Sequence, residues 1–168
     1  MGVVETLIER NADFAKTRFD PRLIMKPALA TIVICCVDTR VDPTYLLGAE
    51  QGEIMAIRNV GGRVTPSTLD ELALLGQVSG DGFGGWELIV LQHTQCGIIR
   101  IQGRRPDLLP PYFQVAEAEM PGVSVADPRA GVSRDVALLR ADPRVAGARV
   151  SGLVYDVTTG LVETVVQP

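Results

Sequence analysis

The chain has 168 residues, 46% of them hydrophobic, a formal net charge of −4 and a mean hydropathy of +0.21. This length predicts one domain over residues 1–168, and the composition supplies enough apolar side chains for a buried core. The mild acidity disfavours nucleic acid and anionic membranes as partners, and no apolar stretch approaches the roughly 18–20 residues that cross a bilayer.

Three cysteines and a single histidine limit the chemistry that this chain can perform. The cysteines are too few for a disulfide framework and odd in number, so we expect reduced thiols that bind a metal or take part in catalysis. The first fourteen residues lack the basic and apolar regions of a signal peptide. Together these features favour a cytoplasmic location and exclude mechanisms that need two histidines.

The first half of the chain predicts one helix followed by two strands. Residues 3–18 are expected to form an amphipathic helix. Its apolar face contains Val4, Leu7, Ile8, Ala12 and Ala15. The continuous, β-branched apolar run at 31–37 is typical of a strand buried on both faces, and residues 53–59 are a second predicted strand.

The second half continues the alternation of helices and strands. Thr65 is the predicted N-cap of a helix over about 66–79, and residues 87–92 are a third buried strand. Prolines interrupt the pattern between about 97 and 126, which we expect to be irregular and to form a lid or an interface segment. The remaining elements are a helix and two strands, predicted at 127–140, 149–156 and 161–166.

Strands that alternate with helices predict an α/β fold, a single domain with a mostly parallel central sheet flanked by helices. Two segments with polar chemistry, residues 34–40 and 92–97, come directly after predicted buried strands. In open α/β sheets, ligand sites form at the carboxyl ends of the strands. We therefore interpret the two segments as parts of one site.

The sulfur and imidazole groups of these segments predict a metal site. Cys36 lies in the first segment, and His93 and Cys96 lie in the second with the spacing His-x-x-Cys. Two thiolates and one imidazole suit Zn²⁺, and three protein ligands leave the fourth tetrahedral position for water or a carboxylate, as in catalytic sites. A buried cysteine on its own usually packs in the core, as we expect for Cys35. A His-x-x-Cys pair on its own is often structural or accidental. Their joint occurrence favours one zinc ion per chain.

Asp38 and Arg40 lie two and four residues beyond Cys36, so an extended segment points all three side chains to one side. An aspartate beside a metal binds the open position unless another group holds it away. An arginine that forks onto the carboxylate does so and keeps it ionised. Asp38 is then able to accept a hydrogen bond from metal-bound water or hydroxide. A solvated surface ion pair is the alternative interpretation of this Asp-x-Arg pair.

The Cys-x-Asp-x-Arg pattern at 36–40, followed by His-x-x-Cys-Gly at 93–97, resembles the β-class carbonic anhydrases. The segment IRNVGG at 57–62 is similar to the glycine segment of that family, and GLVYDVTTG at 152–160 is similar to its last pair of strands. The resemblance therefore extends over nearly the whole chain and is greatest to the short, minimal branch of the family.

The resemblance implies that Cys36, His93 and Cys96 bind zinc and that Asp38 and Arg40 gate the fourth position. It implies the reversible hydration of carbon dioxide to bicarbonate by metal-bound hydroxide. It also implies a homodimer or higher homo-oligomer in which the N-terminal helix packs on the partner subunit.

The glycine segment supplies candidate substrate-binding residues, Arg58, Gly61 and Gly62, which can present backbone amides to an anion such as bicarbonate. A tight turn without a ligand is the alternative. The sequence departs from the family pattern at Gln95, where this branch often has aspartate, and at Asp70, where an arginine is frequent. It also lacks the glutamine that many members carry before the first metal-ligand strand.

Two other functions are compatible with the same residues. Carbonyl sulfide and carbon disulfide are linear and apolar like carbon dioxide, so a hydrolase of either substrate is an alternative on the same zinc scaffold. A non-catalytic zinc- or bicarbonate-binding domain is a further alternative. Asp38 and Arg40 argue against it, because a structural zinc site gains nothing from a gate.

Overall fold

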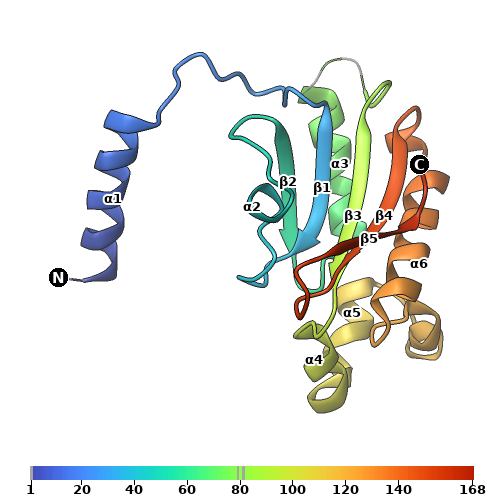
Figure 1. The fold of residues 1–168 in the computed structure, drawn as a ribbon. Helices are drawn as coiled ribbons and strands as arrows, with labels where there is room; N and C mark the ends of the chain where they lie inside the picture. Colours follow the sequence, from blue (N-terminus) through green and yellow to red (C-terminus); the bar gives the residue numbers. More distant parts are fainter. Residues whose placement is uncertain (1, 79, 81) are drawn as a thin grey trace.

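The computed structural model describes residues 2–78, 80 and 82–168. A five-stranded sheet with the order β2-β1-β3-β4-β5 forms its centre (Figure 1). The strands are β1 (Thr31–Cys36), β2 (Ile54–Asn59), β3 (Glu87–His93), β4 (Arg149–Tyr155) and β5 (Val162–Val166). The first four are parallel and β5 is antiparallel to β4, which confirms the predicted α/β fold with a mostly parallel sheet.

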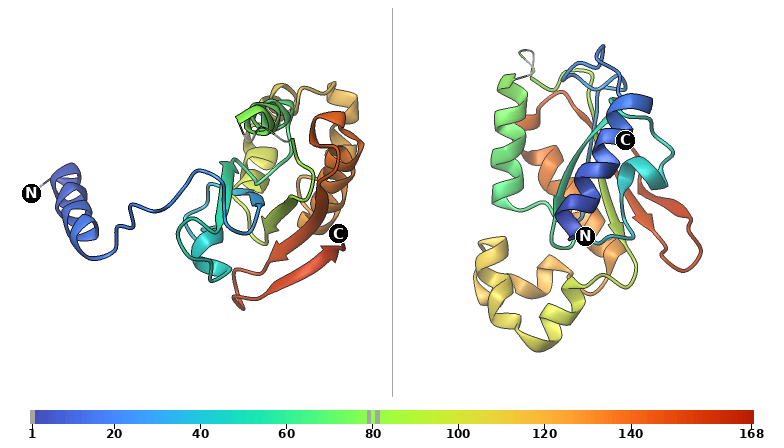
Figure 2. Two further views of the ribbon diagram at one scale, coloured as in Figure 1. Left: turned by 90° about the horizontal axis from the view of Figure 1, so that it is seen from above. Right: turned by 90° about the vertical axis from the view of Figure 1, so that its left-hand side faces the viewer.

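Two long helices, α3 (Pro66–Val78) and α6 (Pro128–Ala141), cover the same face of the sheet (Figure 2). The core between them and the sheet includes Ile32, Leu72 and Val136, each at most 1% exposed. The predicted N-cap of α3 is confirmed, because the hydroxyl of Thr65 accepts a hydrogen bond from the backbone N–H of Thr68 over 3.3 Å. Residue 79, the last position of that predicted helix, lies outside the described residues.

The opposite face of the sheet is covered in part by the short helix α2 (Pro43–Leu46). Its N-cap is Asp42, whose carboxylate accepts hydrogen bonds from the backbone N–H groups of Thr44 and Tyr45. Sequence patterns did not predict this helix, because four residues are too few for a helical period to be visible.

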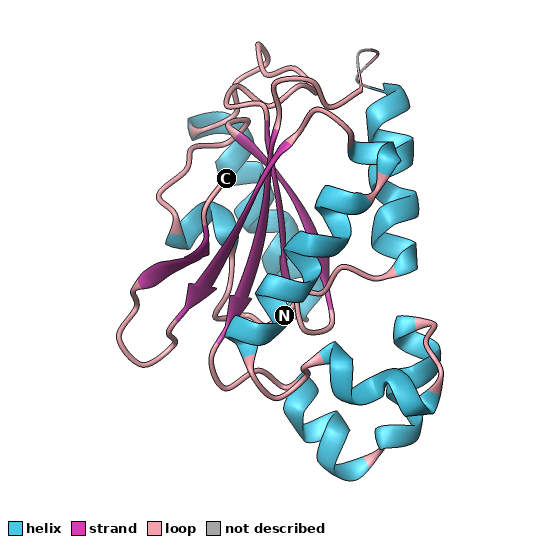
Figure 3. Ribbon diagram, turned by 90° about the vertical axis from the view of Figure 1, so that its right-hand side faces the viewer, coloured by secondary structure: helices cyan, strands magenta, loops and turns pink. Residues whose placement is uncertain are grey.

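The expectation of irregular structure between 97 and 126 is wrong in part, because this segment folds into a group of short helices beyond the carboxyl ends of the strands (Figure 3). They are α4 (Ile98–Arg104), η1 (Pro106–Leu108), α5 (Leu109–Phe113) and η2 (Glu117–Val123). Pro106 begins η1, where a proline costs no hydrogen bond because the first N–H groups of a helix have no partner within it. The prolines therefore divide the helices instead of preventing them. A further short helix, η3 (Pro143–Val145), precedes β4.

The N-terminal helix α1 (Val3–Thr17) lies apart from the sheet, as Figure 1 and the left view of Figure 2 show, and residues 18–30 join it to the sheet. It has no buried residue, and Val3, Val4, Leu7 and Ile8 are each more than half exposed. Among the described residues, no helix is both long and apolar enough to cross a membrane.

Candidate metal centre

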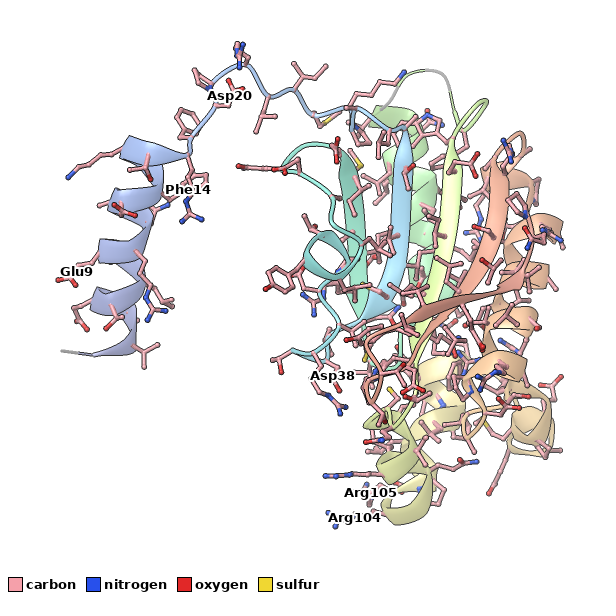
Figure 4. The ribbon with its side chains drawn as sticks, in the orientation of Figure 1. Glu9, Phe14, Asp20, Asp38, Arg104 and Arg105 are labelled. Atoms are coloured by element: carbon pink, nitrogen blue, oxygen red, sulfur yellow. The ribbon has the colours of Figure 1, made fainter. Side chains whose placement is uncertain are left out.

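The pairing of β1 with β3 brings the two polar segments together. Cys35 lies opposite Leu91 in this parallel pair, so Cys36 and His93 both lie at the carboxyl end of the sheet. The chain continues from His93 through a short turn to Cys96, directly before α4. Figure 4 shows Asp38 at the same end of the sheet, on the loop that follows β1.

Cys36, His93 and Cys96 are buried, and one ligand atom from each lies within 4.8 Å of the other two. The two sulfurs are 3.8 Å apart. Two sulfurs bound at about 2.3 Å to one tetrahedral zinc ion are separated by roughly the same distance. The spacing therefore fits one shared zinc ion, whereas a disulfide would need the sulfurs in contact at about 2 Å.

The imidazole of His93 is oriented for metal binding. Its Nδ1 lies 2.9 Å from the backbone carbonyl of Thr94, which only accepts hydrogen bonds, so Nδ1 carries the proton and Nε2 carries the free lone pair in the neutral ring. Nε2 of His93 is buried, and it has no hydrogen-bond partner among the described residues. Such an atom is costly in a folded protein unless it binds something, and it therefore supports a metal at this point.

The two neighbouring cysteines differ in their acidity. The hydrogen bond between the Cys96 and Cys36 sulfurs lowers the pKa of Cys36, and the backbone N–H of Asp38 also donates to the Cys36 sulfur over 3.4 Å. Burial instead raises the pKa of Cys35 to about 12. Cys35 packs with Val33 and Leu91, as predicted, and stays a thiol at neutral pH.

Asp38 and Arg40 form a forked ion pair beside the three ligand-type residues. The Nε and Nη2 of Arg40 donate to the two carboxylate oxygens of Asp38 over 3.0 and 2.7 Å, and the backbone N–H of Arg40 donates over 3.0 Å. The guanidinium holds the pKa of Asp38 far below its usual range. Oδ2 of Asp38 is 3.9 Å from Nε2 of His93, and the Asp38 side chain is only 18% exposed. The carboxylate is therefore sheltered although Arg40 is 47% exposed, and the role of the pair as a gate stays a prediction.

Arg58 lies at the end of β2 and its guanidinium contacts the loop after β1. It donates to the backbone carbonyls of Cys36 and Asp38 over 3.1 and 2.9 Å and lies 3.5 Å from the carboxylate of Asp42. This arrangement fixes the loop that carries Asp38 and Arg40. The role of Arg58 as a substrate-binding residue stays a prediction.

The two glycines have different surroundings. Gly61 lines a cavity of about 350 Å³ together with Cys36, Asp38 and Cys96. Apolar side chains of Val37, Val60 and Ile98 also line this cavity. Gly62 has φ +63°, and a Cβ there would lie 2.8 Å from the backbone nitrogen of Cys36. Position 62 therefore requires glycine, because its backbone lies close to the backbone of Cys36. Substrate binding by Gly61 or Gly62 stays a prediction.

Sequence patterns missed a buried ion pair behind the site. Arg63 and Asp135 are 1% and 0% exposed, and Nε of Arg63 donates to Asp135 over 2.7 Å. Asp135 also accepts hydrogen bonds from the side chain of Gln92 and the backbone N–H of Val64. The two partners are 72 positions apart, so no local pattern could have identified them.

Comparisons with known proteins point to one family. The carbonic anhydrase family model matches residues 31–112. Beta-carbonic anhydrase 1 of Mycobacterium tuberculosis is 33% identical over 99 residues, which are 59% of this chain and 58% of that protein. A carbon disulfide hydrolase of an Acidianus species is 28% identical over 76% of this chain and 72% of its own length. The crystal structure of carbonic anhydrase from Streptococcus mutans superposes with a TM-score of 0.78 at 28% identity and covers 98% of both chains.

Proposed function

Because the chain belongs to the β-class carbonic anhydrase family, we propose that it is a zinc lyase that catalyses the reversible hydration of carbon dioxide to bicarbonate. The observation that carries the proposal is the unpartnered, buried Nε2 of His93, which lies near two cysteine sulfurs and 3.9 Å from the carboxylate of Asp38. The match to M. tuberculosis Beta-carbonic anhydrase 1 covers little more than half of either protein, so the activity is inferred from the site itself.

Cys36, His93 and Cys96 would hold one zinc ion per chain, since their atoms, burial and sulfur separation fit that ion. When bound, zinc supplies Lewis acidity, which makes water acidic enough to lose a proton near neutral pH. The histidine tautomer is already set by the Nδ1 hydrogen bond to Thr94, so His93 would bind without reorganisation.

The other residues of the site would orient the attacking water and the substrate. Asp38 stays ionised because of Arg40, and an ionised carboxylate accepts a hydrogen bond from the attacking water and fixes the direction of its lone pair. The apolar side chains of Val37, Val60 and Ile98 line the adjoining cavity and suit a small, linear and apolar substrate.

Hydrolysis of carbon disulfide or carbonyl sulfide is a second candidate. The carbon disulfide hydrolase of Acidianus aligns with 76% of this chain, a larger share than M. tuberculosis Beta-carbonic anhydrase 1 does. The same carboxylate and the same apolar cavity would serve either substrate, because each is a linear molecule with an electrophilic carbon. A non-catalytic zinc- or bicarbonate-binding domain is the third candidate, and the Asp38–Arg40 pair disfavours it.

The proposal includes a cytoplasmic homodimer or higher homo-oligomer. The helix α1 lies apart from its own sheet and exposes apolar side chains, including Leu7 and Ile8. A second copy of the chain would cover this surface if α1 packs on the partner subunit. All three cysteines are free thiols, which suits a reducing compartment.

The test is a comparison of stopped-flow carbon dioxide hydration with release of sulfide from carbonyl sulfide and carbon disulfide, all on zinc-loaded protein. We expect carbon dioxide hydration to be the faster reaction and zinc to be present at one ion per chain. Cys36→Ala should lose both zinc and activity, whereas the neighbouring Cys35→Ala should keep both. Full zinc content in Cys36→Ala would contradict the proposed site, and faster sulfide release would favour the second candidate.

A further inference from the structure

The guanidinium of Arg40 is also held by a backbone carbonyl from another part of the chain. Nη2 of Arg40 donates to Oδ2 of Asp38 over 2.7 Å and also to the carbonyl oxygen of Gln95 over 3.2 Å. Gln95 lies between His93 and Cys96. The carbonyl therefore connects the loop after β1 to the loop after β3, and it fixes the plane of the guanidinium that holds the carboxylate.

The backbone of Gln95 adopts an unfavourable conformation to present this carbonyl. Its φ is +55°, in the left-handed region that non-glycine residues rarely occupy. Such a conformation costs roughly 1–2 kcal/mol and persists only when surrounding contacts impose it. The contacts that impose it must come from the segments packed against residues 94 and 95.

Those contacts come from the turn between β4 and β5. The side-chain amide of Gln95 donates to the hydroxyl of Thr158 over 3.3 Å. The preceding residue, Thr94, accepts a hydrogen bond from the backbone N–H of Val157 over 3.1 Å, and its hydroxyl lies 3.4 Å from the carboxylate of Asp156. The β4–β5 turn thus holds the loop at 94–95 through three side-chain contacts.

We propose that Gln95 and Thr158 are positioning residues that keep the Asp38–Arg40 gate open. The Thr158 hydroxyl holds the Gln95 side chain, the left-handed backbone of Gln95 presents its carbonyl to Arg40, and Arg40 in turn keeps Asp38 away from the metal. The inference rests on the proposed function, because a gate has meaning only beside a metal with an open position.

The distances show why a small displacement would matter. Oδ2 of Asp38 lies 3.9 Å from Nε2 of His93. A zinc ion bound to Nε2 would lie about 2 Å from that nitrogen, so a small shift of Asp38 would bring its carboxylate within reach of the ion. Arg40 is 47% exposed and has no other anchor among the hydrogen bonds found for the described residues. If Gln95 no longer fixes the guanidinium, the Asp38–Arg40 pair keeps its own hydrogen bonds but is free to shift as a unit, and the carboxylate then competes for the fourth position.

The experiment measures how readily an external anion takes that position. Cobalt(II) is loaded in place of zinc, and azide is titrated at one fixed pH while the visible absorption of the cobalt is recorded. Thr158→Val removes the hydroxyl that anchors Gln95, and Gln95→Gly removes the side chain and frees the backbone. We expect both variants to bind azide roughly three- to tenfold more weakly than the wild type, the effect of one lost hydrogen bond.

Two further variants separate positioning from general damage to the turn. Thr159 lies in the same turn, but its hydroxyl accepts from the backbone N–H of Leu161 and not from Gln95, so Thr159→Val should bind azide as the wild type does. Thr158→Ser keeps a hydroxyl and should restore the wild-type affinity. Equal or tighter azide binding in both Thr158→Val and Gln95→Gly would overturn the positioning role. Failure of the wild-type protein to bind cobalt would instead overturn the proposed function, and the inference with it.

Discussion

Gly62 offers a sharp test of how the fold builds the metal centre. Its φ is +63°, and a Cβ at this position would lie 2.8 Å from the nitrogen of Cys36, 3.0 Å from the carbonyl carbon of Cys35 and 3.1 Å from the carbonyl oxygen of Leu91. All three atoms belong to the backbones of β1 and β3, which cannot rotate away as a side chain can. Gly62→Ala must therefore displace the strand end that carries Cys36.

The size of the effect follows from two contributions. Alanine in the left-handed region costs roughly 1–2 kcal/mol. Overpacking against rigid neighbours adds typically about 1–3 kcal/mol. Gly62→Ala should thus lower the free energy of unfolding by roughly 2–5 kcal/mol. Gly48 is the matched control, because its φ is +67° and no atom lies within 4 Å of its Cβ position. Gly48→Ala should cost only the first contribution.

Urea unfolding of the metal-free proteins measures both free energies, and competition with a chelator measures zinc affinity. We expect Gly62→Ala to be less stable than Gly48→Ala and to bind zinc more weakly than the wild type, while Gly48→Ala keeps the wild-type zinc affinity. Equal losses of stability in the two variants would show that the backbone contact at Cys36 relaxes at no cost. The reasoning from close approach would then be wrong.

Other predictions concern the ion pair, the half-buried phenol of Tyr112 and the N-terminal helix. Asp135→Asn leaves Arg63 buried without a counter-charge and should lower the free energy of unfolding in urea by about 3–5 kcal/mol; a loss below about 1 kcal/mol would contradict this. Burial raises the pKa of Tyr112 to about 12, so the folded state favours the neutral phenol. The stability that Tyr112 contributes should therefore be complete below about pH 10 and be lost as the pH rises toward 12. Ultraviolet titration should detect this late ionisation, and Tyr112→Phe should abolish the pH dependence. Removal of residues 2–17 should give monomers in sedimentation experiments if α1 joins two subunits, and unchanged dimers would exclude that role.

The sequence predicted the features that depend on local patterns. The buried strands were visible as continuous apolar runs, such as residues 31–37, and the start of α3 was visible as a threonine before a proline. The cluster of Cys36, His93 and Cys96 followed from the rule that neighbouring parallel strands end at one edge of the sheet.

The features that the sequence did not predict depend on contacts between distant residues or on backbone geometry. Arg63 and Asp135 meet only after the sheet and α6 have packed, and neither residue carries a local signal of burial. The role of Gln95 depends on a left-handed backbone, which sequence patterns indicate for glycine and asparagine much more than for glutamine. The prolines between 97 and 126 were interpreted as helix breakers, although several of them lie where a helix begins.

The contrast between Cys35 and Cys36 shows that position in the pleat, and not thiol chemistry, decides which of them can bind a metal. Successive side chains of a strand point to opposite faces, so Cys35 packs with Val33 and Leu91 while Cys36 contacts the cluster that contains Cys96. A shift of β1 by one residue would exchange the two cysteines. The pairing of Cys36 with Asn59 on β2 and the contact of Gly62 with the backbone of Cys36 both oppose such a shift. The glycine segment therefore supports the candidate metal centre by fixing the register of the strand that carries Cys36.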